Sequence, residues 1–474
     1  MAIPSPPAPE AAPLSGCRIE LDPATARLDG GVLVGGTPLR LLRLTAVADE
    51  ALGRLLDGTP AEEPAALGLA RLLVDAGLAH PRWDAGPYDL SDVTVIIPIH
   101  DRHRELSSLL SHLEGLRTIV VDDASDEPAL LADVARRHGA TLVRSERLLG
   151  PGGARNLGSQ LATTPLVCFV DSDVVVEPET IGSLLGHFSD RMIGVVAPRI
   201  LGTSGPSLRE RFERDASPLD MGARAALVRP GGRVSYVPAA VLVVRQELAV
   251  DLFDPTLIVG EDVDALWRVL EAGWSARYAP AAHASHPARA TWGAWLLQRY
   301  RYGRSAAVLE ARHGDAAAPL RGSGRALAGW TCLAAGWPIV GISLLAGGVP
   351  QLARQLDGTV GHPERTAALL TGRQVLASAP IVARQLVRSY GPLLALGAVL
   401  SRRGRRAALG TVLLAGLGRW READATLDPA WFAALSTIDD LAYAVGLWHG
   451  AVLARRGGAL RPRRVGGRTR PQAS

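Results

Sequence analysis

Five apolar runs rich in β-branched residues lie between residues 91 and 202, and polar or acidic residues follow most of them. The runs are DVTVIIPIHDR, GLRTIVVDDASDE, ATLVRSE, PLVCFVDSD and IGVVAPRI, with helical stretches between them. Strands that alternate with helices form a mainly parallel sheet, and its ligands bind at the carboxyl ends of the strands. The pattern therefore predicts one α/β domain, which we place at residues 91–315.

Two pairs of acids stand at predicted strand ends. Asp171 and Asp173 follow the fourth run with a spacing at which two carboxylates can hold a divalent cation and, through it, a diphosphate. Taken alone, this pair could equally be a turn that closes a strand with solvated acids. Asp122 and Asp123 end the second run, where a carboxylate can accept hydrogen bonds from a base or a ribose.

A glycine-rich turn, LLGPGGARNLG, precedes a helix that begins near Arg155 and Asn156. Its backbone can approach a nucleotide closely, and its amides and Arg155 favour phosphate charge. The chain contains no lysine, which excludes Schiff-base chemistry and a lysine-bearing phosphate loop. These features predict a nucleotide-diphosphate site that uses a metal in place of a lysine.

A further acidic pair lies in VGEDVDALWRVLEAGW, where Glu261 and Asp262 precede an amphipathic helix. A carboxylate that faces the diphosphate could deprotonate an acceptor hydroxyl. The alternative is that both residues are acids in the first turn of a helix, where they interact favourably with its dipole.

The last third of the chain is apolar. Hydrophobic residues make up 47% of the sequence, and residues 326–351 carry no charge, a length that could cross a bilayer or form a buried helix. Arginine runs in LSRRGRRAAL and RPRRVGGRTRPQ suit an anionic membrane better than a nucleic acid, because no aromatic residues are interleaved. We predict a membrane-associated helical region at 326–455, a basic disordered tail at 456–474, a location on the cytoplasmic face of the membrane, and no nucleic-acid partner.

The N-terminal part has a pattern of its own. Residues 1–16 are rich in proline and alanine and predict a disordered leader. Residues 17–85 predict a hairpin with a Gly-Gly turn and two or three short helices. LLRLTAVADEALGRLLDG and LARLLVDAGLAH resemble the PqqD-like peptide-recognition domain, which implies a winged-helix module; a small structural cap is the alternative. Cys17, Cys168 and Cys332 are isolated, which predicts a reducing compartment.

The central domain resembles the family 2 glycosyltransferases of the GT-A fold. VIIPIHDR, VVDDASDE, GPGGARNLG, VDSD and GEDVD are similar to five motifs of that family, in the same order. The resemblance implies a Rossmann-like mixed sheet and the transfer of a sugar from a UDP- or GDP-sugar with inversion at the sugar carbon. It also implies the following roles: Asp262 with Glu261 as the catalytic base motif, Asp173 as the carboxylate for Mg²⁺ or Mn²⁺, Asp171 as a ribose or metal contact, Asp123 and Arg155 as nucleobase contacts, and Pro98, Asp101 and Asp122 as further contacts of the nucleotide sugar.

Two more segments fit this resemblance. YAPAAHASHP is similar to a strand that ends in a histidine in this family, which makes His286 a metal or phosphate contact or a structural histidine. QRYRYG is similar to the QxxRW motif of chain-extending members, with tyrosine in place of tryptophan. That motif implies that Gln298, Arg301 and Tyr302 bind the acceptor sugar and the diphosphate, while the tyrosine puts strict processivity in doubt.

The arrangement of the whole chain resembles the glycosyltransferases of mycofactocin systems. The resemblance implies that glucose from UDP-glucose is added to a redox cofactor precursor derived from a ribosomal peptide, premycofactocin, as a short β-1,4-linked chain. Two alternatives stay open. One is a membrane glycosyltransferase of cell-wall polysaccharide or polyprenyl-phosphate glycan synthesis, and the other is a non-catalytic protein that binds a peptide and a nucleotide sugar.

Overall fold

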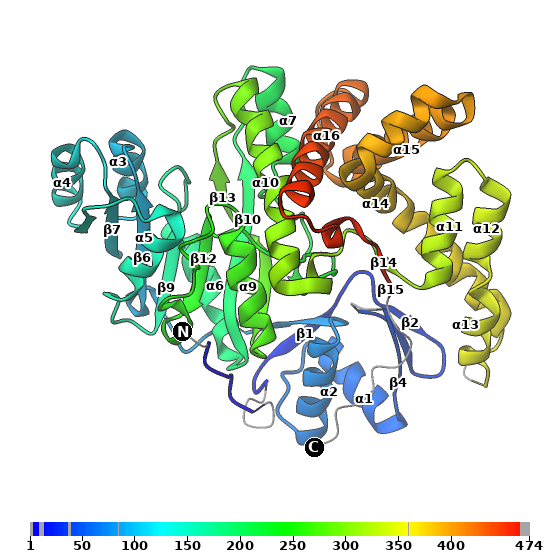
Figure 1. Cartoon of the computed structure of the whole chain (residues 1–474). Coiled ribbons are helices and arrows are strands. Elements are labelled where there is room, and N and C mark those ends of the chain that lie inside the picture. Colours follow the sequence, from blue (N-terminus) through cyan, green and yellow to red (C-terminus); the bar gives the residue numbers. More distant parts are fainter. Residues whose placement is uncertain (1–2, 9–13, 37–38, 84, 359, 465–474) are drawn as a thin grey trace. The chain divides into compact units, whose positions relative to one another are not determined.

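The computed structural model describes residues 3–8, 14–36, 39–83, 85–358 and 360–464. The chain forms two compact units, residues 1–288 and 289–474 (Figure 1). The predicted end of the α/β domain at residue 315 lies beyond this boundary, because the helix that precedes it belongs to the second unit.

An eight-stranded mixed sheet forms the centre of the first unit. In spatial order its strands are β11 (Ala226–Leu227), β13 (Ser275–His286), β10 (Ile193–Gly202), β12 (Val241–Arg245), β9 (Leu166–Val170), β6 (Val93–Ile99), β7 (Arg117–Asp123) and β8 (Thr141–Ser145). β12 is antiparallel to both of its neighbours and β11 is antiparallel to β13. The five strands predicted from the apolar runs all point in one direction. The α/β class and the mixed sheet are confirmed.

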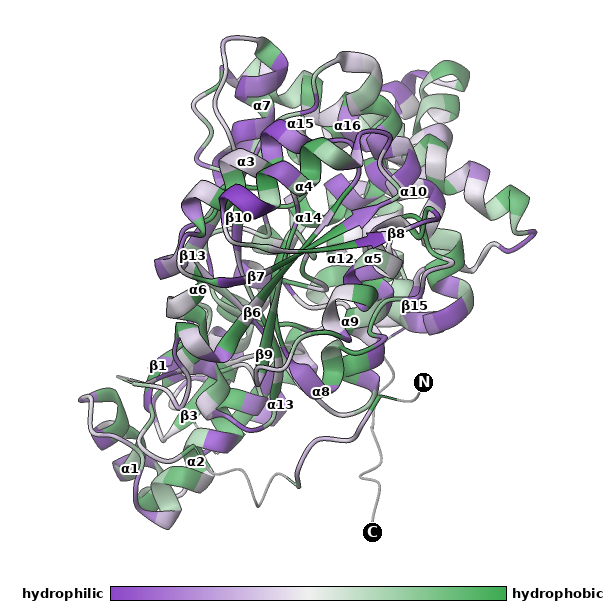
Figure 2. Cartoon of the chain, turned by 90° about the vertical axis from the view of Figure 1, so that its left-hand side faces the viewer, coloured by the Kyte–Doolittle hydropathy of each residue, from purple (hydrophilic) through white to green (hydrophobic). Residues whose placement is uncertain are grey.

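Helices cover both faces of this sheet because successive strand residues point to opposite sides. Val95 and Ile97 of β6 pack in one core with α3 (His103–His112), α4 (Pro128–Arg137) and α6 (Pro178–Leu185). Ile96 packs in a second core with α5 (Gly150–Ser159), α8 (Gln246–Ala249) and α9 (Glu261–Glu271). The strands β6 and β9 are accordingly hydrophobic along most of their length (Figure 2). α7 (Leu208–Ala216) follows β10.

The N-terminal part of the first unit has a small core of its own. The predicted hairpin is present as β2 (Ala26–Leu28) and β3 (Val32–Gly35), with Gly30 and Gly31 at positive φ in the turn. Residue Leu14, which the sequence assigned to a disordered leader, is 1% exposed in this core. The other elements are β1 (Arg18–Leu21), which pairs with β5 (Ala79–Arg82), β4 (Arg40–Arg43), α1 (Ala46–Leu56) and α2 (Pro64–Asp75).

Ion pairs join this N-terminal part to loops next to the sheet within the first unit. Arg71 of α2 donates to both carboxylate oxygens of the buried Asp190, at 3.1 and 2.8 Å. Arg233 pairs with Asp22 at 3.0 Å. A winged-helix or PqqD-like identity for this part stays a prediction.

The second unit is helical, as predicted. Its elements are α10 (Trp292–His313), α11 (Gly324–Ala334), α12 (Pro338–Ala346), α13 (Val349–Leu356), α14 (Pro363–Leu400), α15 (Arg402–Glu422), α16 (Pro429–Leu453) and the short strands β14 (Arg321–Gly322) and β15 (Arg463–Arg464). α10 and α16 are in close contact, because a Cβ atom on Gly303 would lie 2.0 Å from the carbonyl oxygen of Tyr443.

The apolar run at 326–351 does not form the single span that its length allowed, and this expectation was wrong. Gly336 at φ +77° and Pro338 separate α11 from α12, and a Gly-Gly step at 347–348 separates α12 from α13. Among the residues that the structure describes, no helix combines the length and the apolar character needed to cross a membrane.

The predicted disordered tail is partly ordered. Residues 463–464 form β15, and the carbonyl oxygen of Leu460 accepts a hydrogen bond from the hydroxyl of Tyr390 at 2.7 Å. Residues 465–474 lie outside the described part of the chain, as do residues 1–2 and 9–13 of the predicted leader.

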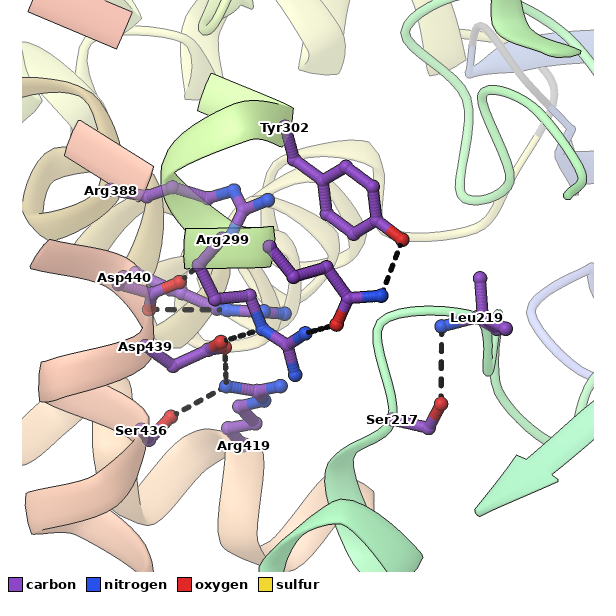
Figure 3. A network of polar contacts seen from close by, with 11 residues as sticks. Ser217, Leu219, Arg299, Tyr302, Arg388, Arg419, Ser436, Asp439 and Asp440 are labelled. Atoms are coloured by element: carbon purple, nitrogen blue, oxygen red, sulfur yellow. Dashed lines mark hydrogen bonds and ion pairs between the residues drawn. The ribbon is translucent and has the colours of Figure 1, made fainter. Parts of the chain in front are cut away.

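Two adjacent aspartates of α16 hold the helices of the second unit together (Figure 3). Asp439 pairs with Arg299 of α10 and, at 2.9 Å, with Arg419 of α15. Asp440 pairs with Arg384 and Arg388 of α14, at 3.4 and 3.1 Å. Both aspartates are 2% exposed. Although burial opposes ionisation, Arg299 and Arg419 hold the pKa of Asp439 well below its usual range.

Candidate active site

Three parallel strands bring the predicted nucleotide-binding residues to one edge of the sheet. Pro98 lies near the end of β6, Asp122 and Asp123 end β7, and Asp171 follows β9. β6 pairs in register with both β7 and β9, so that Ile99 lies beside Asp122. This edge is where open α/β sheets bind their ligands.

The loops that follow β6 and β7 are tied to each other. Asp101 is at φ +58°, its carboxylate accepts a hydrogen bond from the amide of Asp126 at 2.7 Å, and its own amide donates to the Ser125 hydroxyl at 3.0 Å. Asp122 is fully buried, accepts from the amide of Ser125 and pairs with Arg144 at 2.5 Å. Burial opposes its ionisation, but these contacts lower the pKa of Asp122.

The segment predicted as a glycine-rich turn forms the first part of α5, which begins at Gly150 and not near Arg155, and its start is held from within the protein. The two carboxylate oxygens of Asp123 accept hydrogen bonds from the amides of Leu149 and Gly150, at 2.6 and 2.9 Å. These amides belong to the start of α5. Asp123 therefore accepts hydrogen bonds from amides that the sequence analysis had assigned to a phosphate. The structure therefore gives Asp123 a contact with the start of α5, whereas its predicted contact with the nucleobase stays a prediction.

Arg155 connects the end of β9 with the start of α9. Its guanidinium donates to Asp171 at 2.6 Å and to Glu261 at 3.1 Å, and it lies over the ring of Phe253 with 5.1 Å between the guanidinium carbon and the ring centroid. The side chain is buried. Burial disfavours its charge, but Asp171 and Glu261 raise the pKa of Arg155 above its usual value. The predicted nucleobase and metal contacts Arg155 and Asp171 are thus paired with each other.

Asp262 lies one residue further along α9, next to this ion-pair cluster. Its carboxylate accepts a hydrogen bond from the amide of Val263 at 2.8 Å. Desolvation and the neighbouring charge of Glu261 raise the pKa of Asp262 to about 7. A carboxylate that titrates near neutral pH can accept a proton during a reaction and be ready for the next turnover.

Asp173 lies between two basic side chains. It pairs with Arg102 at 2.5 Å, and the Nε2 atom of His286 is 3.4 Å from its other oxygen. Although burial opposes ionisation, His286 and Arg102 hold the pKa of Asp173 well below its usual range. The predicted neighbours Asp173 and His286 are therefore brought together, and Arg102 is a third member that the sequence reasoning missed.

The residues present fit a divalent cation that is shared with a substrate. Asp173 and His286 are adjacent and offer one oxygen and one nitrogen ligand. The described ranges contain no group of three or more histidine, cysteine or acidic side chains arranged to hold a metal. Mg²⁺ bound through one or two protein groups takes its remaining ligands from water and phosphate oxygens. Binding of a cation at Asp173 requires that Arg102 gives up its ion pair.

Asn156 is another residue whose role the sequence did not reveal. Its side chain donates to the carbonyl oxygen of Phe253 at 2.7 Å and accepts from the amide of the same residue at 3.0 Å. The loop before α9 is thereby fastened to α5. An asparagine three residues after a glycine pair gives no sequence signal for a partner 97 positions away.

The predicted acceptor residues lie in the second unit, on α10. The side-chain amide of Gln298 donates to the hydroxyl of Tyr302 at 3.0 Å, and its oxygen accepts from Arg299 at 2.6 Å (Figure 3). Arg301 is exposed. The Gln298 and Tyr302 side chains are thus oriented by the same network that contains Asp439.

The sequence matches one family model and a curated relative over most of its length. Residues 94–245 match the model of the family described as glycosyl transferase family 2. The chain is 40% identical over 451 residues to the pre-mycofactocin glycosyltransferase of Mycobacterium tuberculosis strain H37Rv, covering 92% of this chain and 94% of the relative. Among solved structures, the mannosyltransferase PcManGT from Pyrobaculum calidifontis, in complex with GDP-Man and Mn²⁺, aligns with a TM-score of 0.39 at 18% identity, over 61% of this chain and 87% of that one.

Proposed function

The chain belongs to the family of the pre-mycofactocin glycosyltransferase, within the family 2 glycosyltransferases, and from this premise we propose that it transfers glucose from UDP-glucose to premycofactocin. The identity extends over nearly the whole chain, which supports the same acceptor class for both proteins. The product we propose is a short β-1,4-linked glucan chain on this peptide-derived redox cofactor precursor.

We propose that transfer is a single inverting displacement. The acceptor hydroxyl oxygen attacks the anomeric carbon of the donor sugar, the hydroxyl proton passes to Asp262, and the bond from that carbon to the diphosphate breaks to release UDP. The observation that supports this role is the position of Asp262 beside Glu261 and Arg155, with a pKa of about 7. Burial and the charge of Glu261 keep Asp262 basic enough to accept a proton, and Arg155 fixes Glu261 in place.

Asp173 and His286 would hold Mg²⁺ or Mn²⁺ against the donor. A divalent cation at this position supplies positive charge that stabilises the diphosphate as it leaves. Arg102, released from Asp173 in that state, is near enough to the same edge of the sheet to bind phosphate oxygens. We assign Asp101, Asp122 and Pro98 to the shape of the nucleotide pocket, and Gln298, Arg301 and Tyr302 to the acceptor and diphosphate.

The donor and the acceptor are tested together by incubating the purified protein with premycofactocin and ¹³C-labelled UDP-glucose, UDP-galactose or GDP-mannose. Mass spectrometry is expected to show a series of products with added hexose units only with UDP-glucose. Label in an organic lipid phase would point instead to a lipid-linked acceptor, and binding of UDP-glucose without any product would point to a non-catalytic protein. Either result contradicts the proposal.

Substitution of Asp173 by alanine tests the cation site. We expect UDP affinity in the presence of Mn²⁺ to fall at least about tenfold, because even residues behind metal ligands contribute 10- to 100-fold to metal affinity. UDP affinity measured by calorimetry without metal should change little. Glu179→Ala is the matched control, because this acid is exposed on α6 in the same segment and should leave both affinities unaltered. Equal metal-dependent affinity in Asp173→Ala and the native chain would remove Asp173 from the site.

A further inference from the structure

The helices α14 and α15 form a hairpin whose tip combines exposed apolar side chains with a cluster of four exposed arginines. A single residue, Ser401, connects the two helices, and we call residues 392–414 the hairpin tip. Large apolar side chains are exposed along it: Leu393 51%, Leu396 54%, Val399 77%, Leu400 73% and Leu409 60%. Four exposed arginines, Arg402, Arg403, Arg405 and Arg406, lie between the last two of these.

The charge around this tip is entirely of one sign. Residues 365–421 contain ten arginines and no aspartate or glutamate. Arg384, Arg388 and Arg419 pair with the two aspartates of α16. The four tip arginines have no ion pair with any carboxylate in the described ranges. The side-chain hydrogen bond that the structure gives them runs from the Arg405 guanidinium to the carbonyl oxygen of Ala398 at 3.4 Å.

The position of these arginines is also unfavourable within the protein itself. They occupy the first turns of α15, which begins after the Ser401 cap. The amino-terminal end of a helix carries partial positive charge, so that cations there are repelled. Four cations that make no ion pair within the described part of the chain therefore create a positive potential that an external anion would relieve. The exposed leucines and valine on the same tip require that this partner also accepts apolar side chains.

We propose that the hairpin tip binds the surface of an anionic phospholipid bilayer. Lipid phosphates would pair with the four arginines while Leu396, Val399 and Leu400 enter the boundary between headgroups and acyl chains. A single-stranded nucleic acid fits less well, because residues 391–419 contain no aromatic side chain on which a base could stack. The proposal is independent of the donor and the acceptor assigned above.

Two variants of the full chain test this surface. The first, Arg402→Gln with Arg403→Gln, Arg405→Gln and Arg406→Gln, removes the charge; the second, Leu396→Ser with Val399→Ser and Leu400→Ser, removes the apolar part. The matched control replaces four other exposed arginines of the second unit, Arg365, Arg373, Arg455 and Arg456, by glutamine. Net charge changes equally in the first variant and the control, so that only the location of the charge differs. Thermal melting and circular dichroism establish that each variant is folded.

Co-sedimentation with vesicles is the measurement. The native chain is expected to bind vesicles that contain roughly a third phosphatidylglycerol. This binding should weaken at high salt, and binding to vesicles of pure phosphatidylcholine should be hardly detectable. The arginine variant should bind about 100- to 1,000-fold more weakly, since each of the four arginines near an anionic surface contributes about fivefold. The apolar variant should also bind more weakly, and the control should keep most of the affinity.

Three results would overturn the proposal. The first is a folded native chain that stays in solution with anionic vesicles. The second is an equal loss of binding in the arginine variant and the control, which would mean that net charge alone is responsible. The third is tight binding to a single-stranded RNA oligomer that the arginine variant loses, combined with weak vesicle binding, which would assign the tip to nucleic acid.

Discussion

Replacing Asp262 by asparagine is expected to lower kcat by about 100- to 10,000-fold, the range that a positioned general base contributes. UDP affinity should stay close to that of the native chain, because the carboxylate is assigned to the acceptor hydroxyl. Initial rates with UDP-glucose and premycofactocin, together with calorimetric UDP titrations, measure both quantities. Asp251→Asn is the matched control: this aspartate is exposed, lies before the same helix, and adopts a φ of +55° that asparagine tolerates.

The pH dependence of kcat/KM tests the assignment of Asp262 as the base independently. A base must be deprotonated to act, so kcat/KM of the native chain should rise with pH and level off above the pKa of about 7. The folded-state pKa lies above that of an unfolded aspartate, so the stability associated with protonated Asp262 is lost as the pH rises through 7. Asp262→Asn should therefore unfold at the same temperature as the native chain or a higher one at pH 8. A variant with near-native turnover, or one that has lost activity by unfolding, would contradict the assignment.

The second large effect concerns stability. Asp439→Asn is expected to reduce the free energy of unfolding of the second unit by about 3–5 kcal/mol, because Arg299 and Arg419 would remain buried without their common counter-charge. Urea unfolding, followed by the fluorescence of tryptophans in α10 and α16, measures this change. Asp428→Asn is the control on the same helix. It alters an amino-terminal cap, whose full removal costs about 1 kcal/mol.

A second variant shows whether the loss of stability in Asp439→Asn comes from the unpaired buried charges or from disturbed packing of α16. Replacing Arg299, Arg419 and Asp439 together by methionine, methionine and leucine removes the buried charges without leaving any of the three unpaired. Buried ion pairs replaced in this way often give proteins of similar or higher stability. The triple variant should therefore be more stable than Asp439→Asn alone. If both variants lose the same free energy, packing and not charge determines the effect.

The sheet and the edge that carries the acids could be predicted because each strand and the acid that follows it are neighbours in the sequence. Each β-branched run from DVTVIIPI to IGVVAPRI is a strand, and the acids at 122, 123, 171 and 173 stand where those strands end. This information lies within a few residues of each strand. The direction of β12 was not visible in the same way, since an apolar run has no mark that distinguishes a parallel from an antiparallel strand.

Other features of the site depend on pairs of residues that are distant in sequence. Arg102 pairs with Asp173, and Arg155 joins Asp171 to Glu261, but an arginine side chain can reach many partners and the sequence does not choose among them. A membrane span at 326–351, one of the two possibilities that the length of the run allowed, is not formed for a local reason. A count of uncharged residues ignores the positive φ of Gly336 and the proline two positions later, which end one helix and begin the next.

The two attachments around α9 have a consequence for redesign. Asn156 fixes the backbone of Phe253, and Arg155 fixes Glu261, so the seven residues between them are anchored at both ends while Ile258 is 82% exposed. In antibodies, loops anchored on a rigid framework accept very different sequences without disturbing it. Within residues 254–260, an exposed position such as Ile258 can therefore be varied while both ends of the segment stay in place, whereas the buried Leu257 and Gly260, at φ +85°, have to be kept.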